Sequence, residues 1–228
     1  ARELYLSSQL LSKYIRLNIT EQRSSIWLAQ RQGRTKNGYD ITEQGLLKML
    51  DMSGKADFKT NFEELNIVPV AITYEYDPCD ALKGYQFQLK RDQSDYKKSK
   101  NEDLTHMSTG LSGRKGRVHF AFGKPINSGL DAIASLPKNE QVAAIAELID
   151  RQIYANYHLC ANSYIALDAI EGTDKRKAHY TAEQKDEFLA YADKKIAAIE
   201  GADHDYVLDQ MLHAYANPLI NQEKTLGA

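Results

Sequence analysis

The chain has 228 residues, of which 43% are hydrophobic and 26% are charged. This length and composition predict one large domain, or a domain with an appendage, built on a real apolar core, and they argue against a disordered chain. The formal net charge of −2 gives no global reason to expect a nucleic acid as partner. No apolar run approaches the roughly 20 residues needed to span a bilayer. We therefore expect a soluble or at most peripheral protein.

The only two cysteines, Cys79 and Cys160, have no metal-ligand spacing. They are predicted to be buried, reduced thiols rather than a disulfide, which fits a cytoplasmic protein. No pair of cysteine or histidine residues has the spacing of a zinc site, so neither a metal nor another cofactor is expected.

Residues 1–136 carry the pattern of an α/β domain. The chain opens directly into an amphipathic helix over residues 1–19, which suggests a piece of a longer protein. Three apolar runs predict strands: a buried one at residues 25–29, one covered on both faces at 67–74, and a third at 118–123. Further helices are expected at 43–51, 57–65 and 80–91, and a mobile surface loop at 93–116. The predicted fold is a mixed sheet with flanking helices.

The pattern changes at Pro137, after which no strand is expected. Apolar residues recur with helical spacing over residues 138–170, and two more helices are expected at 181–200 and 203–216. Thr181 is a suitable first cap for the former of these. We therefore divide the chain into an α/β part at 1–136 and a helical part at 137–228.

The most distinctive segment lies between residues 26 and 38. An apolar run leads into a cationic, glycine-punctuated loop that ends in the turn signal Asn37-Gly38. Glycine lets backbone N–H groups approach an anion closely, arginine can grip a phosphate with two parallel hydrogen bonds, and lysine adds a point charge. The candidate phosphate-binding residues are Arg31, Gln32, Gly33, Arg34 and Lys36. The alternative is a solvated basic turn.

Two motifs resemble the glycerol-3-phosphate and lysophosphatidate acyltransferase family. The segment 26–34 resembles the third family motif, roughly Phe-Pro-Glu-Gly-Thr-Arg-Ser. Gly33 matches its glycine, Gln32 stands in place of its glutamate, and Arg34 matches its arginine if one residue is missing. Further along, Val68-Pro69-Val70 resembles the fourth motif, a strand of the type Val-Pro-Val-x-Ile. This match also places the proline near the start of a strand, where its missing N–H does least harm.

The resemblance implies transfer of a fatty acyl group from acyl-CoA or acyl-carrier protein to a glycerol-phosphate-type acceptor in phospholipid synthesis. In this family a histidine, with an aspartate five positions later, acts as general base on the acceptor hydroxyl. The third motif then binds the acceptor phosphate, and Val68, Pro69 and Val70 support the acyl site. The co-substrates are the acyl thioester and the phosphorylated glycerol. The implied location is the cytoplasm, with peripheral contact at the inner face of the membrane.

The catalytic pair of that family has no counterpart in the expected place, so we expect it upstream of Ala1. The one matching spacing, His204 to Asp209, follows the two motifs and falls in a predicted helix, where the side chains point about 140° apart. His119, in an apolar strand, is expected to be a satisfied core residue, and Asp77 or Asp80 to cap a helix. The chain alone is expected to be inactive. The rival hypothesis is a non-catalytic module that binds an anionic ligand or a partner.

Overall fold

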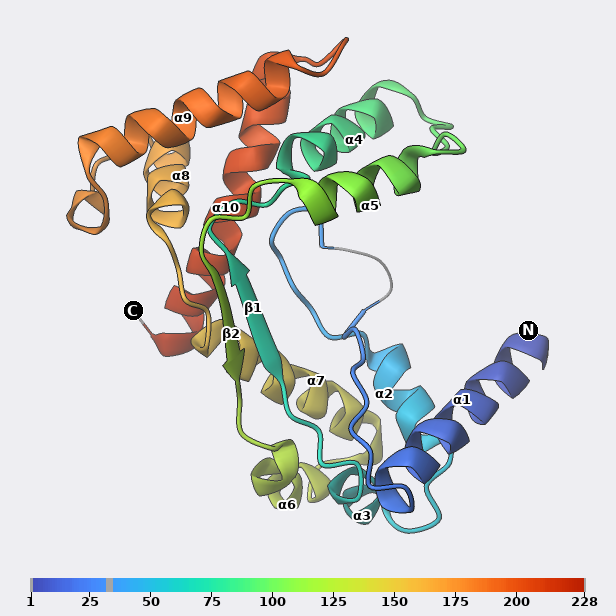
Figure 1. Ribbon diagram of the computed structural model, residues 1–228. Coiled ribbons are helices and arrows are strands. Elements are labelled where there is room, and N and C mark those ends of the chain that lie inside the picture. Colours follow the sequence, from blue (N-terminus) through green and yellow to red (C-terminus); the bar gives the residue numbers. More distant parts are fainter. Residues whose placement is uncertain (1, 32–34, 228) are drawn as a thin grey trace. The chain divides into compact units, whose positions relative to one another are not determined.

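The computed structural model describes residues 2–31 and 35–227 (Figure 1). Helices account for 61% of the chain and strands for 4%. The helices are α1 (Arg2–Thr20), α2 (Gln44–Asp51), α3 (Phe58–Glu63), α4 (Asp80–Asp92), α5 (Glu102–Ser112), α6 (Leu130–Ala134), α7 (Lys138–Ala155), α8 (Ala161–Glu171), α9 (Ala182–Ala197) and α10 (His204–Leu226). Short 3₁₀ turns lie at Ile126–Gly129 and Lys177–His179.

The strands β1 (Val70–Tyr74) and β2 (Val118–Phe122) form one antiparallel pair. The predicted mixed α/β sheet, acyltransferase-like in kind, is therefore wrong. The run at residues 25–29 is neither a strand nor buried, and Trp27 is 63% exposed. A run of β-forming residues becomes a strand only when a neighbour satisfies its backbone groups, and among the described residues only β1 and β2 pair.

Pro69 lies directly before β1, as the sequence predicts. Its carbonyl accepts a hydrogen bond from the Gly123 amide at 2.8 Å, and the Ile67 carbonyl accepts one from Ile126 at 3.0 Å. These contacts continue the pairing past the ends of the two strands. Pro69 only accepts a hydrogen bond there, so its missing N–H costs no contact.

The chain divides into two compact units. The first comprises residues 1–34, 40–71 and 122–156, and the second comprises 35–39, 72–121 and 157–228. The boundary suggested at residues 136 and 137 lies within the continuous segment 122–156 of the first unit.

In the first unit, α1 and α2 pack together through one set of apolar contacts and one set of polar contacts. Ile15 and Leu50 are buried, and the Ser12 hydroxyl lies 2.8 Å from the Ser53 hydroxyl. Arg16 completes the polar set with an ion pair to Glu64 at 2.7 Å. The helix α1 therefore buries Ser12 and Ile15, although Leu4, Leu10 and several other large apolar residues of this helix are exposed.

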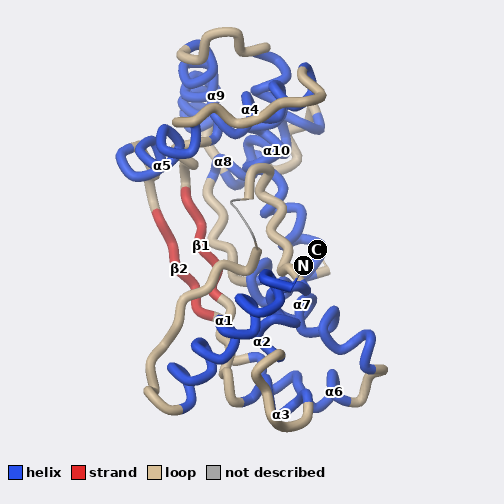
Figure 2. Tube along the Cα trace, turned by 90° about the vertical axis from the view of Figure 1, so that its right-hand side faces the viewer, coloured by secondary structure: helices blue, strands red, loops and turns tan. Residues whose placement is uncertain are grey.

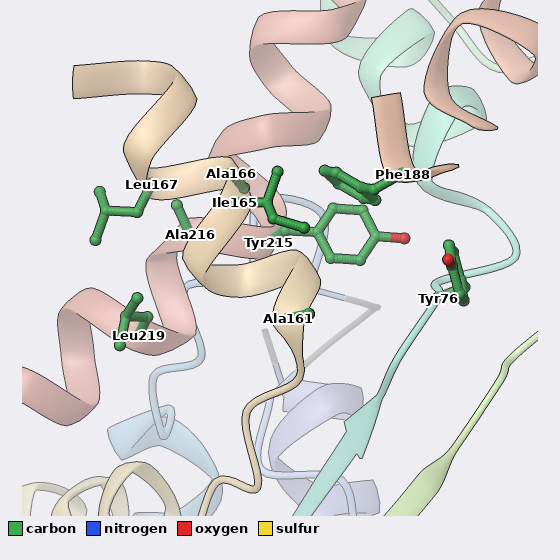
Figure 3. Packing of buried hydrophobic residues seen from close by; sticks show 9 residues of the cluster. All are labelled: Tyr76, Ala161, Ile165, Ala166, Leu167, Phe188, Tyr215, Ala216 and Leu219. Atoms are coloured by element: carbon green, nitrogen blue, oxygen red, sulfur yellow. The ribbon is translucent and has the colours of Figure 1, made fainter. Parts of the chain in front are cut away.

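The second unit is built on α8, α9 and α10, with its largest apolar cluster around Phe188 and Tyr215 (Figure 3). The two rings meet edge to face with centroids 5.0 Å apart. The α9 helix begins at a capping box in which Thr181 and Gln184 satisfy each other's backbone amides, so the predicted start is confirmed. Asp168, on α8, receives the Arg176 amide at 2.9 Å and the Tyr180 hydroxyl at 2.8 Å, which fixes the α8–α9 connection.

The segment 93–116, predicted to be a loop, contains the helix α5 beside α4 (Figure 2). The Tyr96 hydroxyl and the Gln86 amide both donate to Glu102, in the first turn of α5. His106 faces inward and is buried. These contacts hold a helix whose inward face is largely polar.

Candidate anion-binding loop

The chain on both sides of the basic loop is fixed in the first unit. The Glu43 amide donates to the Gln30 carbonyl at 2.9 Å, which ties the two ends of the segment together. The carboxylate of Asp150, on α7, accepts from the amide and the hydroxyl of Thr42 at 2.9 and 2.6 Å. Burial raises the pKa of Asp150, and the two Thr42 hydrogen bonds oppose that rise. The base of the loop is thus held by α7.

Arg31 is the first residue of the basic loop, and its side chain gives the clearest indication of a bound ligand. Its Nε is buried and has no hydrogen-bond acceptor among the described residues. A buried donor without an acceptor costs about 1–3 kcal/mol, more for a charged group. An oxyanion placed beside this guanidinium would remove that cost. Gln32, Gly33 and Arg34, predicted to share the same ligand, lie outside the described residues.

The Asn37-Gly38 turn is confirmed, and it packs in the second unit against α10. Gly38 has φ of +69°, and a Cβ at this position would lie 2.1 Å from the Ala214 carbonyl oxygen. Pro218, inside α10, lacks the backbone N–H that would otherwise donate to the Ala214 carbonyl four residues earlier. The Asn217 side-chain amide donates to the Asn37 carbonyl at 2.7 Å. Only glycine fits this position without displacing the turn.

Lys36 directly precedes this turn, in the second unit, whereas Arg31 belongs to the first. The two cations predicted to bind one phosphate are therefore carried by different units. Their joint role stays a prediction.

The fourth-motif residues lie where the chain enters β1. Pro69 is buried, Val70 is partly buried at the first position of the strand, and Val68 is exposed. The preceding Asn66 adopts φ of +46°, a left-handed conformation that asparagine tolerates. Support of an acyl site by these three residues stays a prediction.

The histidine and aspartate with the catalytic spacing do not meet. His204 Nε2 lies 3.0 Å from Asp193 and its Nδ1 lies 3.2 Å from Asp205, whereas Asp209 lies 3.5 Å from His213. These partners raise the pKa of His204, chiefly through Asp205. His204 and Asp209 are therefore parts of a charged helix surface, as expected.

The other histidines also have ordinary surroundings. His119 is exposed on β2 and lies against His158 with ring centroids 4.7 Å apart, so the prediction of a core histidine is wrong. His179 stacks on Tyr164 at 4.1 Å. Cys79 and Cys160 are both buried thiols that form no disulfide, as predicted.

Asp80, one of the two aspartates expected to cap a helix, is a buried carboxylate in the first turn of α4. Asp80 accepts from the hydroxyls of Tyr215 at 2.8 Å and Tyr191 at 3.0 Å, and from the Ala81 amide at 2.8 Å, and it lies 3.9 Å from Lys195. Burial raises its pKa despite these donors. Because the carboxylate is enclosed and its oxygens are used, its role is to fix the start of α4 to α9 and α10.

No group of three or more metal-ligating side chains occurs in the part of the chain that the structure describes. None of the helices in residues 2–31 and 35–227 is long and apolar enough to cross a membrane. Comparisons with protein-family models, with curated proteins and with solved structures found no match.

Proposed function

We propose that this chain binds the phosphate of a glycerol-phosphate-type acceptor through Arg31, Gly33 and Arg34, as part of an acyltransferase of phospholipid synthesis. The observation that carries the proposal is the buried, unpartnered Nε of Arg31 at the head of a loop with a fixed base. The motif residues Gly33 and Arg34 support it from the sequence. The fold expected from the resemblance is not proposed, because the described residues form only a two-stranded sheet.

The chemistry of this loop suits a phosphate monoester. An arginine offers parallel N–H donors to two phosphate oxygens, and each such charge-assisted bond is stronger than a neutral one. The glycine permits close approach of backbone N–H groups to the same anion. The loop therefore binds and orients the acceptor, with its reacting hydroxyl left free.

Acyl transfer needs more than this loop supplies. A base must take the proton of the acceptor hydroxyl, whose oxygen then attacks the thioester carbonyl of acyl-CoA or acyl-carrier protein and releases the thiol. His204 and Asp209 do not form such a base, since each has another partner. We therefore expect the 228-residue chain to bind the acceptor without transferring an acyl group. The proposed location is cytoplasmic, at the inner face of the membrane.

Calorimetric titration of the chain with sn-glycerol 3-phosphate tests the binding step. Arg31→Ala and Arg34→Ala should each weaken binding by about 10- to 100-fold, the worth of a hydrogen bond to a charged group. Arg151→Ala removes an exposed arginine of α7 in the same unit and is the matched control. Unchanged affinity in Arg31→Ala, or no binding by the unmodified chain, would overturn the proposal.

The second candidate is a non-catalytic module that binds an anionic ligand, and the separation of His204 from Asp209 favours it. Two measurements separate the candidates. An acceptor site should prefer glycerol 3-phosphate over inorganic phosphate, because it also contacts the glycerol. A general anion module should bind the two alike. Acyl transfer by the purified chain at an enzymatic rate would instead show that the catalytic base is present after all.

A further inference from the structure

The helix α5 presents an apolar stripe to solvent. Leu104, Met107 and Leu111 are 66%, 60% and 81% exposed. Their spacing of three and four residues places them on one face of the helix. His106 lies on the opposite face and is buried against the rest of the second unit. Large apolar residues thus point away from the core of this unit.

The segment around α5 is strongly cationic. Residues 97–117 hold six lysines and arginines and two acidic residues, a net charge of +4. Since the whole chain carries −2, the remaining residues carry −6. The cationic residues gather just before and just after the helix, namely Lys97, Lys98, Lys100, Arg114, Lys115 and Arg117.

Two of these lysines lie at the two ends of the apolar stripe. Lys98 forms an ion pair at 2.6 Å with Asp103, which neighbours Leu104 on α5. Lys115 Nζ lies 3.0 Å from the Leu111 carbonyl and 3.1 Å from that of Gly113. Lys97, Lys100 and Lys115 form no ion pair with any carboxylate of the described residues. Arg114 and Arg117 pair with Glu187 and Glu75 at 2.9 and 3.2 Å, so the positive charge left without an ion pair beside the stripe is that of Lys97, Lys100 and Lys115.

We propose that α5 docks on an anionic lipid surface, with its Leu/Met stripe inserted at the boundary between headgroups and acyl chains. Exposed leucine and methionine on one face of a helix, flanked by lysine and arginine, is the arrangement of helices that lie in the membrane interface. Basic residues close to an anionic leaflet each contribute about 1 kcal/mol, roughly a fivefold gain in affinity. A second copy of the chain fits the stripe poorly, because it would bring two sets of lysines without ion pairs together.

Co-sedimentation of the 228-residue chain with lipid vesicles tests this surface. One set of vesicles contains phosphatidylcholine alone, and in the other one lipid in three is phosphatidylserine. We expect binding to the second set only, weakened by added salt. The variant Lys97→Gln/Lys98→Gln/Lys100→Gln should bind about 100-fold more weakly. The variant Leu104→Ser/Met107→Ser/Leu111→Ser should lose binding.

Controls separate this surface from the other features of the molecule. Leu4→Ser/Leu10→Ser removes exposed leucines from α1 and should leave vesicle binding unchanged. Arg31→Ala should also leave vesicle binding unchanged. The experiments therefore distinguish failure of the proposed phosphate site from failure of the proposed α5 surface. Met107→Trp in a Trp27→Phe background adds a reporter without removing the stripe, and its emission should shift to shorter wavelength with phosphatidylserine vesicles only.

Three results would overturn the proposal: no binding to either vesicle type, equal binding to both, or α5 variants that bind like the unmodified chain. A tryptophan at position 107 whose emission ignores the vesicles would do so as well, even where a serine variant fails to fold. Loss of binding in the α1 variant alone would move the docking surface to the first unit.

Discussion

Gly38→Ala is the sharpest test of how the basic loop is held. Gly38 has φ of +69°, and an added methyl group would lie 2.1 Å from the Ala214 carbonyl oxygen and 3.0 Å from Pro218 Cδ. Neither neighbour can rotate away, because the first is helix backbone and the second a proline ring. The turn, or the middle of α10, must shift.

The expected cost has two parts. A left-handed conformation costs a residue with a Cβ about 1–2 kcal/mol. Overpacking against fixed neighbours adds about 1–3 kcal/mol. The sum is about 2–5 kcal/mol of unfolding free energy. Gly172 provides the matched control, because its φ is +63° and a Cβ there meets nothing within 4 Å. Gly172→Ala should cost only the conformational part, about 1–2 kcal/mol.

Urea unfolding of the two variants, compared at equal m values, measures the difference directly. Gly38→Ala should be the less stable of the two variants. Equal destabilisation of the two variants would refute the packing of the Asn37-Gly38 turn against α10.

Three further outcomes are expected. Phe188→Ala, at a fully buried ring, should lower the unfolding free energy by about 3–5 kcal/mol in urea titrations. Burial alone would raise the pKa of Asp168, but hydrogen bonds, chiefly from Arg176, outweigh it and hold that pKa below 3.8. The stabilisation that ionised Asp168 contributes is therefore complete above pH 3.8 and is lost as the pH falls through the folded-state pKa. The difference in unfolding free energy between the unmodified chain and Asp168→Asn should therefore narrow in acid. A difference that does not change with pH would contradict this. Finally, Leu4→Ser/Leu10→Ser should lower the mean mass that light scattering reports at high concentration, because the exposed α1 face favours self-association; an unchanged mass would refute that role.

Helices with an inward apolar stripe were predictable from the sequence, and α1, α2, α3 and α4 begin and end close to the expected residues. The helical region also follows its periodicity, down to the capping box at Thr181. In α2 the apolar spacing and the packed face coincide, whereas α1 has a recognisable helical pattern although most of its large apolar residues are exposed.

The failures have a common physical origin. The run at residues 25–29 was expected to be buried because it is apolar, but Trp27 is exposed and no strand pairs with it among the described residues. The helix α5 was missed because the lysines, glycines and other polar residues of 93–116 indicated a loop, although Leu104, Met107 and Leu111 have helical spacing. Residue type alone therefore did not decide whether a segment is buried or helical.

The candidate site was only partly accessible to sequence reasoning. Arg31 and the Asn37-Gly38 turn could be selected from residue types, but the buried state of the Arg31 Nε could not. The Asp80 network was out of reach, because Tyr191 and Tyr215 lie 111 and 135 residues further along the chain.

The most direct test of the central claim is an amide chemical-shift map of the chain titrated with sn-glycerol 3-phosphate. Binding at the proposed loop predicts saturable shifts at the amides of residues 30–38, and their loss in Arg31→Ala. Shifts confined to other cationic segments, such as residues 97–100, or no saturable shift at all, would contradict an acceptor-phosphate site at Arg31.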